Sequence, residues 1–254
     1  MTQALRTHHL GFSVVDLDLA VELIRAFDFE EVTRLHAGGD DMARGNDLPG
    51  ASAEIALVRR GTLLIELLEF EDKIPPAFVE SSRAWVRLPV SNPSWTNSEL
   101  GIVARRLAPH PTSGTELRRM LDLAGLPIRG EDGTRSGELR PIVYSPVADV
   151  PRAGELYKRL GFAGTADGTR FERDDLVIEL EPYSRGEDLR PSPNKIGHIH
   201  VAVEVASIEE VWADLDAAGF SFLSRPIRSA GPMWWAFIRE PLGTGVELVD
   251  LTTA

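Results

Sequence analysis

THHLGFSVVDLDLAVELI (7–24) and GHIHVAVEVASIEEVWADL (197–215) are the two segments that decide the fold of this chain, because they repeat one pattern near its two ends. Each copy opens with an alternating stretch that carries a histidine and continues into an amphipathic stretch of helical period. GTLLIELLEF (61–70) follows the first copy and GTGVELVDL (243–251) follows the last, and each places a glutamate on a predicted final strand. The repeat predicts two similar units built from strands and one helix.

The opening strand of the first copy has two distinct faces. Leu10 and Phe12 lie on one face and His9 on the other, since successive side chains of a strand alternate. Asp16 is placed to cap the amphipathic helix that follows. The apolar strand face can pack on that helix, which leaves His9 facing a cavity or a partner sheet.

Further strands complete each copy. In the first copy, glycines within residues 38–50 predict an irregular segment. Strands are expected at 53–59 and 62–70. In the last copy, Ser207 and Glu210 have the spacing of a capping box at the start of the helix. The later strands of this copy are expected at 220–226, 233–239 and 245–251. Both copies therefore have the order βαβββ.

A third copy lies between these two and has lost its histidine. It comprises the segments 141–162 and 174–183. When its helix is aligned with that of the first copy, Ile142 stands where the first copy has His9. Glu179 occupies the place of the glutamate on the final strand. The third copy is therefore expected to serve as scaffold.

A second copy is expected to be the most degenerate. Residues 98–129 look like its opening strand and helix, with Glu99 at the histidine position. Segments 72–96 and 184–195 contain several prolines and few periodic apolar positions, so they read as connectors. The expected units are residues 1–72, 84–135, 136–190 and 196–254.

The composition of the 254-residue chain limits its class of function. A net charge of −12 repels phosphate backbones and anionic lipid surfaces, so neither nucleic acid nor a membrane is expected as a partner. Because the chain has no cysteine, any metal must be held by imidazole and carboxylate. No stretch approaches the roughly 20 apolar residues of a membrane span. These features predict a soluble, cytoplasmic protein.

The openings HHLGFSVVDLD (8–18) and HIHVAVEV (198–205) and the ending EPLGTGVELVDL (240–251) resemble the vicinal oxygen chelate superfamily. This group includes glyoxalase I, methylmalonyl-CoA epimerase, extradiol ring-cleaving dioxygenases and antibiotic-sequestering resistance proteins. The resemblance is strong in the first and last quarters of the chain and moderate in the third. It implies an α+β fold of repeated βαβββ units that form half-open mixed-sheet barrels, with a metal at the centre that binds two neighbouring substrate oxygens.

Carried over residue by residue, the resemblance implies His9, Glu66, His200 and Glu247 as metal ligands, with His198 in reserve beside His200. Imidazole and carboxylate ligands suit Zn, Ni, Co, Mn or Fe. The four ligands converge within one chain only if the first unit pairs with the last, so residues 1–72 are expected to pair with residues 196–254 and to act on a small-molecule substrate bound between them. A homodimer could also bring these two units together from different chains.

This ligand set predicts a divalent-metal-dependent enzyme of the glyoxalase or epimerase type. It would act as an isomerase, epimerase or lyase that removes a proton next to a metal-chelated oxygen, with Glu66 and Glu247 as candidate catalytic bases. Trp235 and Arg239 are the candidate substrate-binding residues. One alternative is a non-haem iron ring-cleaving dioxygenase, although Ile142 breaks the ligand pattern of the four-unit members. The other alternative is a metal-free binding protein of the resistance type.

Overall fold

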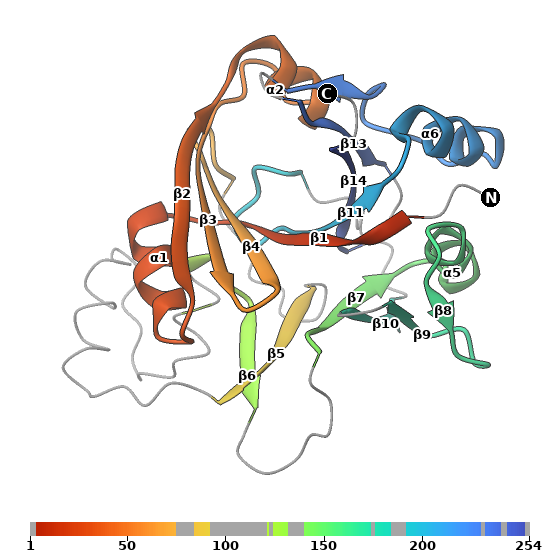
Figure 1. The fold of residues 1–254 in the computed structure, drawn as a ribbon, viewed down its shortest axis with the longest axis horizontal. Helices are drawn as coiled ribbons and strands as arrows, with labels where there is room; N and C mark the ends of the chain where they lie inside the picture. The colour runs from red at the N-terminus through yellow and green to blue at the C-terminus, as the bar shows by residue number, and fades with distance from the viewer. Residues whose placement is uncertain are drawn as a thin grey trace.

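The computed structural model describes residues 4–74, 84–91, 121, 124–131, 140–173, 176–183, 192–229, 232–239 and 243–251. Two sheets organise these residues (Figure 1). The strand order of the eight-stranded sheet is β12 (Ile227–Arg228), β13 (Trp234–Ile238), β14 (Gly245–Asp250), β11 (Ile199–Val205), β1 (Ala4–Ser13), β4 (Leu63–Phe70), β3 (Ala53–Arg60) and β2 (Glu30–Ala37). The strand order of the six-stranded sheet is β6 (Ile128–Glu131), β5 (Trp85–Ser91), β7 (Ile142–Val147), β10 (Leu176–Pro182), β9 (Arg170–Arg173) and β8 (Ala163–Gly164).

Helices lie on the faces of these sheets. The described helices are α1 (Leu17–Arg25), α2 (Gly39–Asn46), α5 (Val150–Arg159) and α6 (Ile208–Ala217). Helix α1 packs on β3 and β4, α5 packs on the smaller sheet, and α6 packs on β13 and β14. Within the described part of the chain, no helix combines the length and the apolar character needed to cross a membrane.

The helix starts predicted from the sequence are confirmed. The side chain of Asp16 accepts a hydrogen bond from the backbone N–H of Leu19 at 2.7 Å and so caps α1. The side chain of Ser207 accepts one from the N–H of Glu210 at 3.4 Å and caps α6. Each cap satisfies a backbone donor that has no partner within the helix, which fixes the residue at which the helix begins.

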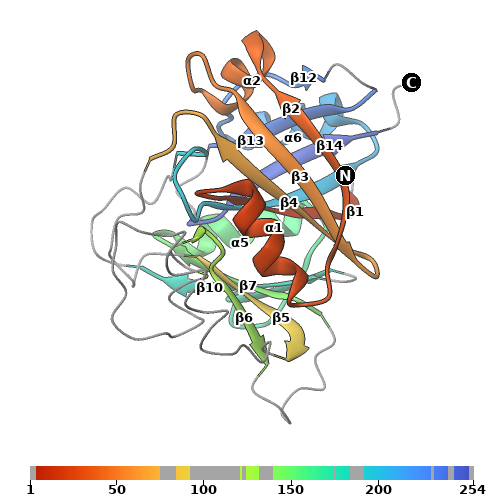
Figure 2. The ribbon, with the colours of Figure 1, turned by 90° about the vertical axis from the view of Figure 1, so that its left-hand side faces the viewer.

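The two ends of the chain meet in the middle of the larger sheet. Strand β1 pairs antiparallel with β11, while β1 pairs parallel with β4 and β11 pairs parallel with β14. This sheet curls so that one face is concave, as the two views show (Figures 1 and 2). The other face carries Leu10 and Phe12, which are fully buried in a hydrophobic core shared with the smaller sheet. The fold is the α+β, glyoxalase-like fold, and the apolar face of the opening strand sets which face is left for the site.

The pairing register is the same in three parts of the chain. Glu66 lies opposite Gly11, two residues after His9, and Glu247 lies opposite Ala202, two residues after His200. In the smaller sheet, Glu179 lies opposite Tyr144, which is two residues after Ile142. The first and last copies therefore place a histidine and a glutamate in equivalent positions of adjacent strands. The boundaries of the four units stay a prediction.

Three expectations for local structure were wrong. Residues 38–50 are not wholly irregular, because α2 forms there with acidic residues in its first turn and a left-handed residue, Asp47, at its end. The expected strand 220–226 is reduced to an isolated bridge between Phe222 and Ile238, and Pro226 lacks the N–H group that a ladder would need. Pairing resumes only at β12.

A third error concerns the expected connector 72–96. Strand β5 lies in this segment and is held between β6 and β7, with Val86 and Leu88 fully buried. Its alternating apolar positions outweigh the prolines on either side, since tertiary packing overrides local turn signals. Glu99 and most of the expected opening at 98–129 lie outside the described residues.

Candidate metal centre

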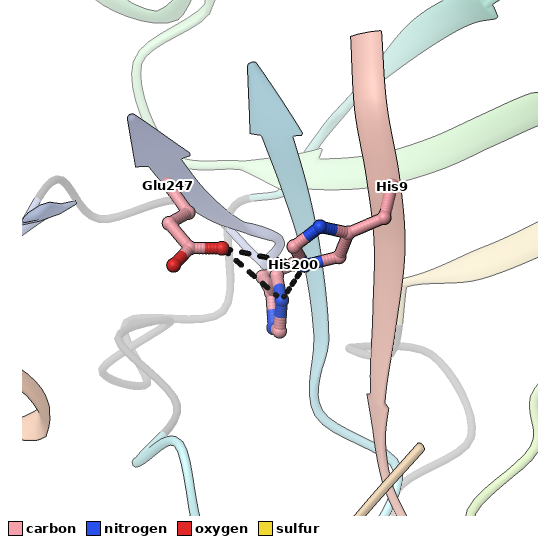
Figure 3. Close-up of side chains that lie close together, drawn as sticks. All are labelled: His9, His200 and Glu247. Carbon is pink, nitrogen blue, oxygen red and sulfur yellow. Dashed lines mark hydrogen bonds and ion pairs between the residues drawn. The ribbon is translucent and has the colours of Figure 1, made fainter. Parts of the chain in front are cut away.

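Four side chains meet on the concave face of the larger sheet. His9, Glu66, His200 and Glu247 come from β1, β4, β11 and β14, four strands that are neighbours in this sheet. Figure 3 shows His9, His200 and Glu247 pointing toward one point from three different strands. His9 lies opposite Ala202 and His200 lies opposite Gly11, so the two histidines are diagonal neighbours across the β1–β11 pair and the site exists only where the two ends of the chain join.

The donor atoms are spaced as the ligands of a single ion would be. The Nε2 atoms of His9 and His200 lie 3.1 Å apart. Oε2 of Glu66 is 3.4 Å from each of these nitrogens, and Oε2 of Glu247 is 3.3 Å from that of His9 and 3.7 Å from that of His200. Ligands bound tetrahedrally at zinc distances are about 3.4 Å from one another. The separations among His9, His200 and Glu247 therefore fit one small divalent cation, and Glu66 lies beside both histidines but outside the group whose donors are all within 4.8 Å of one another.

Burial makes the charges in this site interdependent. Burial by itself lowers the pKa of His9, but the carboxylates of Glu66 and Glu247 outweigh it and raise that pKa to about 10. Burial raises the pKa of Glu66, yet the two histidines more than compensate and hold it well below its usual range. The carboxylates thus favour positive charge at this point, whether it is a proton on His9 or a bound cation.

Glu247 provides a separate test of whether a metal fits. Its Oε2 atom is buried and has no hydrogen-bond partner among the described residues. Its nearest neighbours of opposite polarity are the imidazoles of His9 and His200, at 3.3 and 3.7 Å. A buried carboxylate oxygen that accepts no well-formed hydrogen bond keeps part of its desolvation cost, and a coordinated cation would offset that cost. His9, His200 and Glu247 each offer a donor atom within 4.8 Å of the others, and Glu66 is a fourth donor beside both histidines. These residues fit a divalent metal.

His198 lies beside this centre without joining it. Its ring centroid is 6.3 Å from that of His200. Burial, with further repulsion from His200, lowers the pKa of His198 to about 3, so the imidazole is neutral. His198 is not among the donors grouped at the centre, and it stays a reserve ligand only as a prediction.

Two further residues shape the centre and were not singled out from the sequence. Gly11 lies opposite His200, and a Cβ atom at position 11 would overlap the His200 imidazole. The ring of Phe237 meets that imidazole edge to face, with centroids 5.2 Å apart. A glycine inside an alternating strand is a sequence signal for such close approach, and HHLGF contains it. Phe237 had no comparable signal.

The candidate substrate-binding residues lie against α2 and the residue that follows it. Trp234 and Trp235 face opposite ways, as alternation predicts, and Trp235 shares a cluster with Phe237 on the site face. The Trp235 indole packs tightly over Gly45 of α2, where a Cβ atom would overlap it. Arg239 donates to the carboxylate of Asp47, just after α2, at 2.6 Å. Substrate contact by Trp235 and Arg239 stays a prediction.

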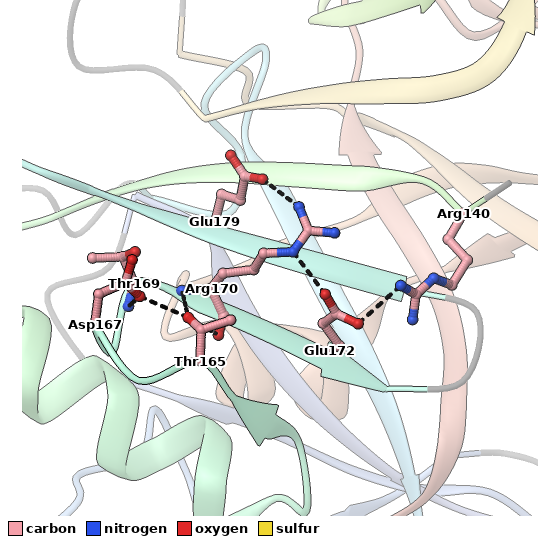
Figure 4. Close-up of polar contacts among 7 residues, drawn as sticks. All are labelled: Arg140, Thr165, Asp167, Thr169, Arg170, Glu172 and Glu179. Atoms are coloured by element: carbon pink, nitrogen blue, oxygen red, sulfur yellow. Dashed lines mark hydrogen bonds and ion pairs between the residues drawn. The ribbon is translucent and has the colours of Figure 1, made fainter. Parts of the chain in front are cut away.

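The equivalent position in the smaller sheet holds an arginine in place of a second ligand set. Arg170 donates to Glu179 at 2.6 Å and to Glu172 at 2.7 Å, and Arg140 also donates to Glu172 (Figure 4). With Ile142 at the histidine position, Glu179 has an internal cation as its partner. This network explains why the carboxylate is retained without a metal-binding arrangement.

Comparison with known proteins finds a family resemblance over part of the chain. A model of the Glyoxalase/Bleomycin resistance protein/Dioxygenase superfamily matches residues 142–248, a span that contains His200 and Glu247. Residues 142–248 therefore resemble this superfamily, which is also known as vicinal oxygen chelate. No curated protein matches the chain.

Two solved structures share the fold of this chain over nearly its whole length. A glyoxalase I mutant from Zea mays is 15% identical, with a TM-score of 0.55 over 98% of this chain and 94% of that one. A putative dioxygenase from Bacillus subtilis is 12% identical, with a TM-score of 0.55 over 99% of this chain and 87% of that one. At such low identity the likeness is one of fold, so the reaction of this protein has to be argued from its own residues.

Proposed function

We propose that this protein is a divalent-metal-dependent enzyme that isomerises, epimerises or eliminates by removing a proton next to a metal-chelated oxygen of a small molecule. In this proposal His9, Glu66, His200 and Glu247 hold the metal. The observation that carries it is that Nε2 of His9 and Nε2 of His200 lie 3.1 Å apart and that Oε2 of Glu66 and Oε2 of Glu247 each lie 3.3 to 3.7 Å from both nitrogens. Oε2 of Glu247 is also buried and accepts no hydrogen bond among the described residues.

The two glutamates differ in their freedom to move. The side chain of Glu66 is 19% exposed and that of Glu247 is 8% exposed. A divalent cation held here would polarise a substrate oxygen and make the adjacent C–H bond more acidic. Glu66 is then the better-placed base, because it can turn from the centre toward the substrate, take the proton and return it to the neighbouring carbon or the opposite face. Glu247, the more buried of the two, would stay as a ligand.

The surroundings of Glu66 and Glu247 favour an uncharged, apolar substrate body. Leu57 lies opposite Glu66 on β3, and Phe237 lies opposite Glu247 on β13, so both occupy the site face beside the donors. Leu64 adjoins Glu66 on the same face of β4 and, like Leu57, is half-buried. A substrate bound through two oxygens would place its remaining atoms against these side chains.

The metal content of the purified protein tests the proposed function. Protein prepared without chelators should contain about one Zn, Ni, Co or Mn per chain, measured by elemental analysis, and should lose it on dialysis against a chelator. Exchange of a substrate C–H proton with D₂O, followed by NMR on a panel of hydroxy-ketones and 2-substituted acids, should depend on that metal. Glu66→Gln should abolish exchange in protein that still holds metal.

A ring-cleaving dioxygenase is a second candidate, favoured by one observation. The three donors within 4.8 Å of one another, His9, His200 and Glu247, are two histidines and one carboxylate, the set used by non-haem iron oxygenases. Redox-active iron in the purified protein, with oxygen uptake on addition of a catechol, would support this candidate over the first. A protein that binds no metal but retains a small molecule would support the resistance-type alternative.

A further inference from the structure

Strand β1 contains a bulge immediately before His9. Thr7 pairs with Val203 and His9 pairs with Ala202, so His8 is an extra residue with no counterpart on β11. Adjacent residues of a regular strand point to opposite faces, whereas a bulge can turn the inserted side chain toward its neighbour. The rings of His8 and His9 accordingly meet edge to face, with centroids 5.0 Å apart.

The contact between these two rings is a hydrogen bond between like atoms. Nδ1 of His8 lies 2.7 Å from Nδ1 of His9, while Nε2 of His9 points the other way, toward His200. One Nδ1 must donate and the other must accept. If Nε2 of His9 uses its lone pair on a cation, the His9 proton is on Nδ1. His9 then donates, and His8 accepts with its own proton on Nε2.

We propose that His8 is the positioning residue of the metal centre: its Nδ1 accepts the Nδ1–H of His9, and this bond fixes the tautomer and the ring orientation that present Nε2 of His9 to the cation. Metal-binding histidines generally donate their second N–H to a carboxylate or carbonyl, and loss of that partner weakens metal binding. Here the β1 bulge supplies a neighbouring imidazole for the same purpose. This inference rests on the proposed function, because it assigns a role toward the same metal.

The surroundings of His8 make this role testable. His8 is half-buried and borders a pocket that is also lined by Thr7 and Leu64 of the larger sheet and by Pro141 and Leu176 of the smaller one. Truncation at position 8 therefore removes the hydrogen bond with little loss of close packing. His8→Asn keeps an acceptor, since the Asn carbonyl oxygen is attached to Cγ as Nδ1 is in histidine, whereas His8→Ala keeps none.

The experiment measures Zn²⁺ affinity by competition with a chromophoric chelator for the wild-type protein, His8→Ala, His8→Asn and His36→Ala. His36 is a matched control, because it is an exposed histidine on β2 that contacts Glu54 at 2.9 Å. His8→Ala should weaken Zn²⁺ binding by about 10- to 100-fold, while His8→Asn and His36→Ala bind nearly as well as wild type. In the zinc-loaded protein, ¹H–¹⁵N NMR should show a slowly exchanging Nδ1 proton of His9 in wild type and His8→Asn and its loss in His8→Ala.

Other results would contradict either the role of His8 alone or the metal centre as a whole. Wild-type affinity in His8→Ala, or equal weakening in His8→Ala and His8→Asn, would show that His8 does not act as an acceptor, and the metal centre would stand without it. If the wild-type protein binds no Zn²⁺, Ni²⁺, Co²⁺, Mn²⁺ or Fe²⁺, both the proposed function and the role of His8 fail. Free energies of unfolding of the metal-free variants, measured in urea, separate loss of the bond from loss of the fold.

Discussion

Nε2 of His9 lies 3.1 Å from Nε2 of His200, although 191 positions separate these residues along the chain. Two buried imidazoles with facing nitrogens repel each other unless a proton or a cation lies between them. The antiparallel pairing of β1 with β11 brings the two rings together. The negative charges of Glu66 and Glu247 offset the repulsion between them. The geometry of the metal centre therefore depends on the pairing of β1 with β11 in the larger sheet.

Glu66 and Glu179 form a natural pair of test and control, because they occupy the same register in different sheets. Glu66→Gln should weaken Zn²⁺ binding by more than tenfold, since it removes a charged donor from the centre. Glu179→Gln should leave Zn²⁺ affinity unchanged, because Glu179 is already paired with Arg170. Isothermal titration of the metal-free proteins with Zn²⁺ measures both. Equal losses in the two variants would count against the assignment of Glu66.

Gly11→Ala should damage the metal centre while leaving the sheet intact. The new methyl group would overlap the imidazole of His200, which must then rotate away from His9. We expect Zn²⁺ affinity to fall by about tenfold or more, a cost typical of a misaligned ligand. Gly38→Ala is the control, because its Cβ atom would come no closer than 3.2 Å to a neighbouring side chain. Retained affinity in Gly11→Ala, with a circular dichroism spectrum like that of wild type, would contradict the prediction.

The ion pair between Arg239 and Asp47 should contribute little to stability. Its two side chains are 37% and 57% exposed, so solvent screens their attraction. Arg239→Gln should lower the free energy of unfolding by no more than about 1 kcal/mol and leave metal affinity unchanged. Urea unfolding of the two single variants and the double variant with Asp47→Asn gives the coupling directly. A coupling well above about 1 kcal/mol would show that the pair holds the end of α2 against the end of β13.

Tyr157→Phe should stabilise the protein or leave its stability unchanged. The hydroxyl of Tyr157 is buried in the core without a hydrogen-bond partner among the described residues, so removing it could add up to about 1–3 kcal/mol to the free energy of unfolding. A loss of stability greater than about 1 kcal/mol would reveal a partner for the hydroxyl.

The same residue predicts an alkaline effect. Burial raises the pKa of Tyr157 above its ordinary value of about 10, so the unfolded chain ionises first as the pH rises. The stability that comes from keeping this group neutral is complete below about pH 10 and is lost at higher pH. Wild type should therefore lose stability more steeply above about pH 10 than Tyr157→Phe, as measured by urea unfolding across that range. Parallel curves for the two proteins would contradict this.

Much of the local structure follows from side-chain type and spacing. Asp16 and Ser207 begin their helices because their side chains reach a backbone N–H three residues on, a property of sequence alone. Leu10 and Phe12 are buried because alternation assigns them to one face. The strand expected at 220–226 does not form, because a strand requires a neighbouring strand that pairs with it along its length. In this segment only Phe222 makes a bridge.

The sequence by itself determined the repeat, the apolar faces and the helix starts, because these depend on side-chain type and on the 2.0 and 3.6 residue periods. The four candidate donors came from the resemblance of the repeated segments to a known superfamily. Only the tertiary structure decided that β1 pairs with β11, that Gly11 makes room for the His200 ring and that a bulge turns His8 toward His9. These three features depend on pairing between segments nearly 200 residues apart, and the free energy of such pairing comes from the shared core and not from local pattern.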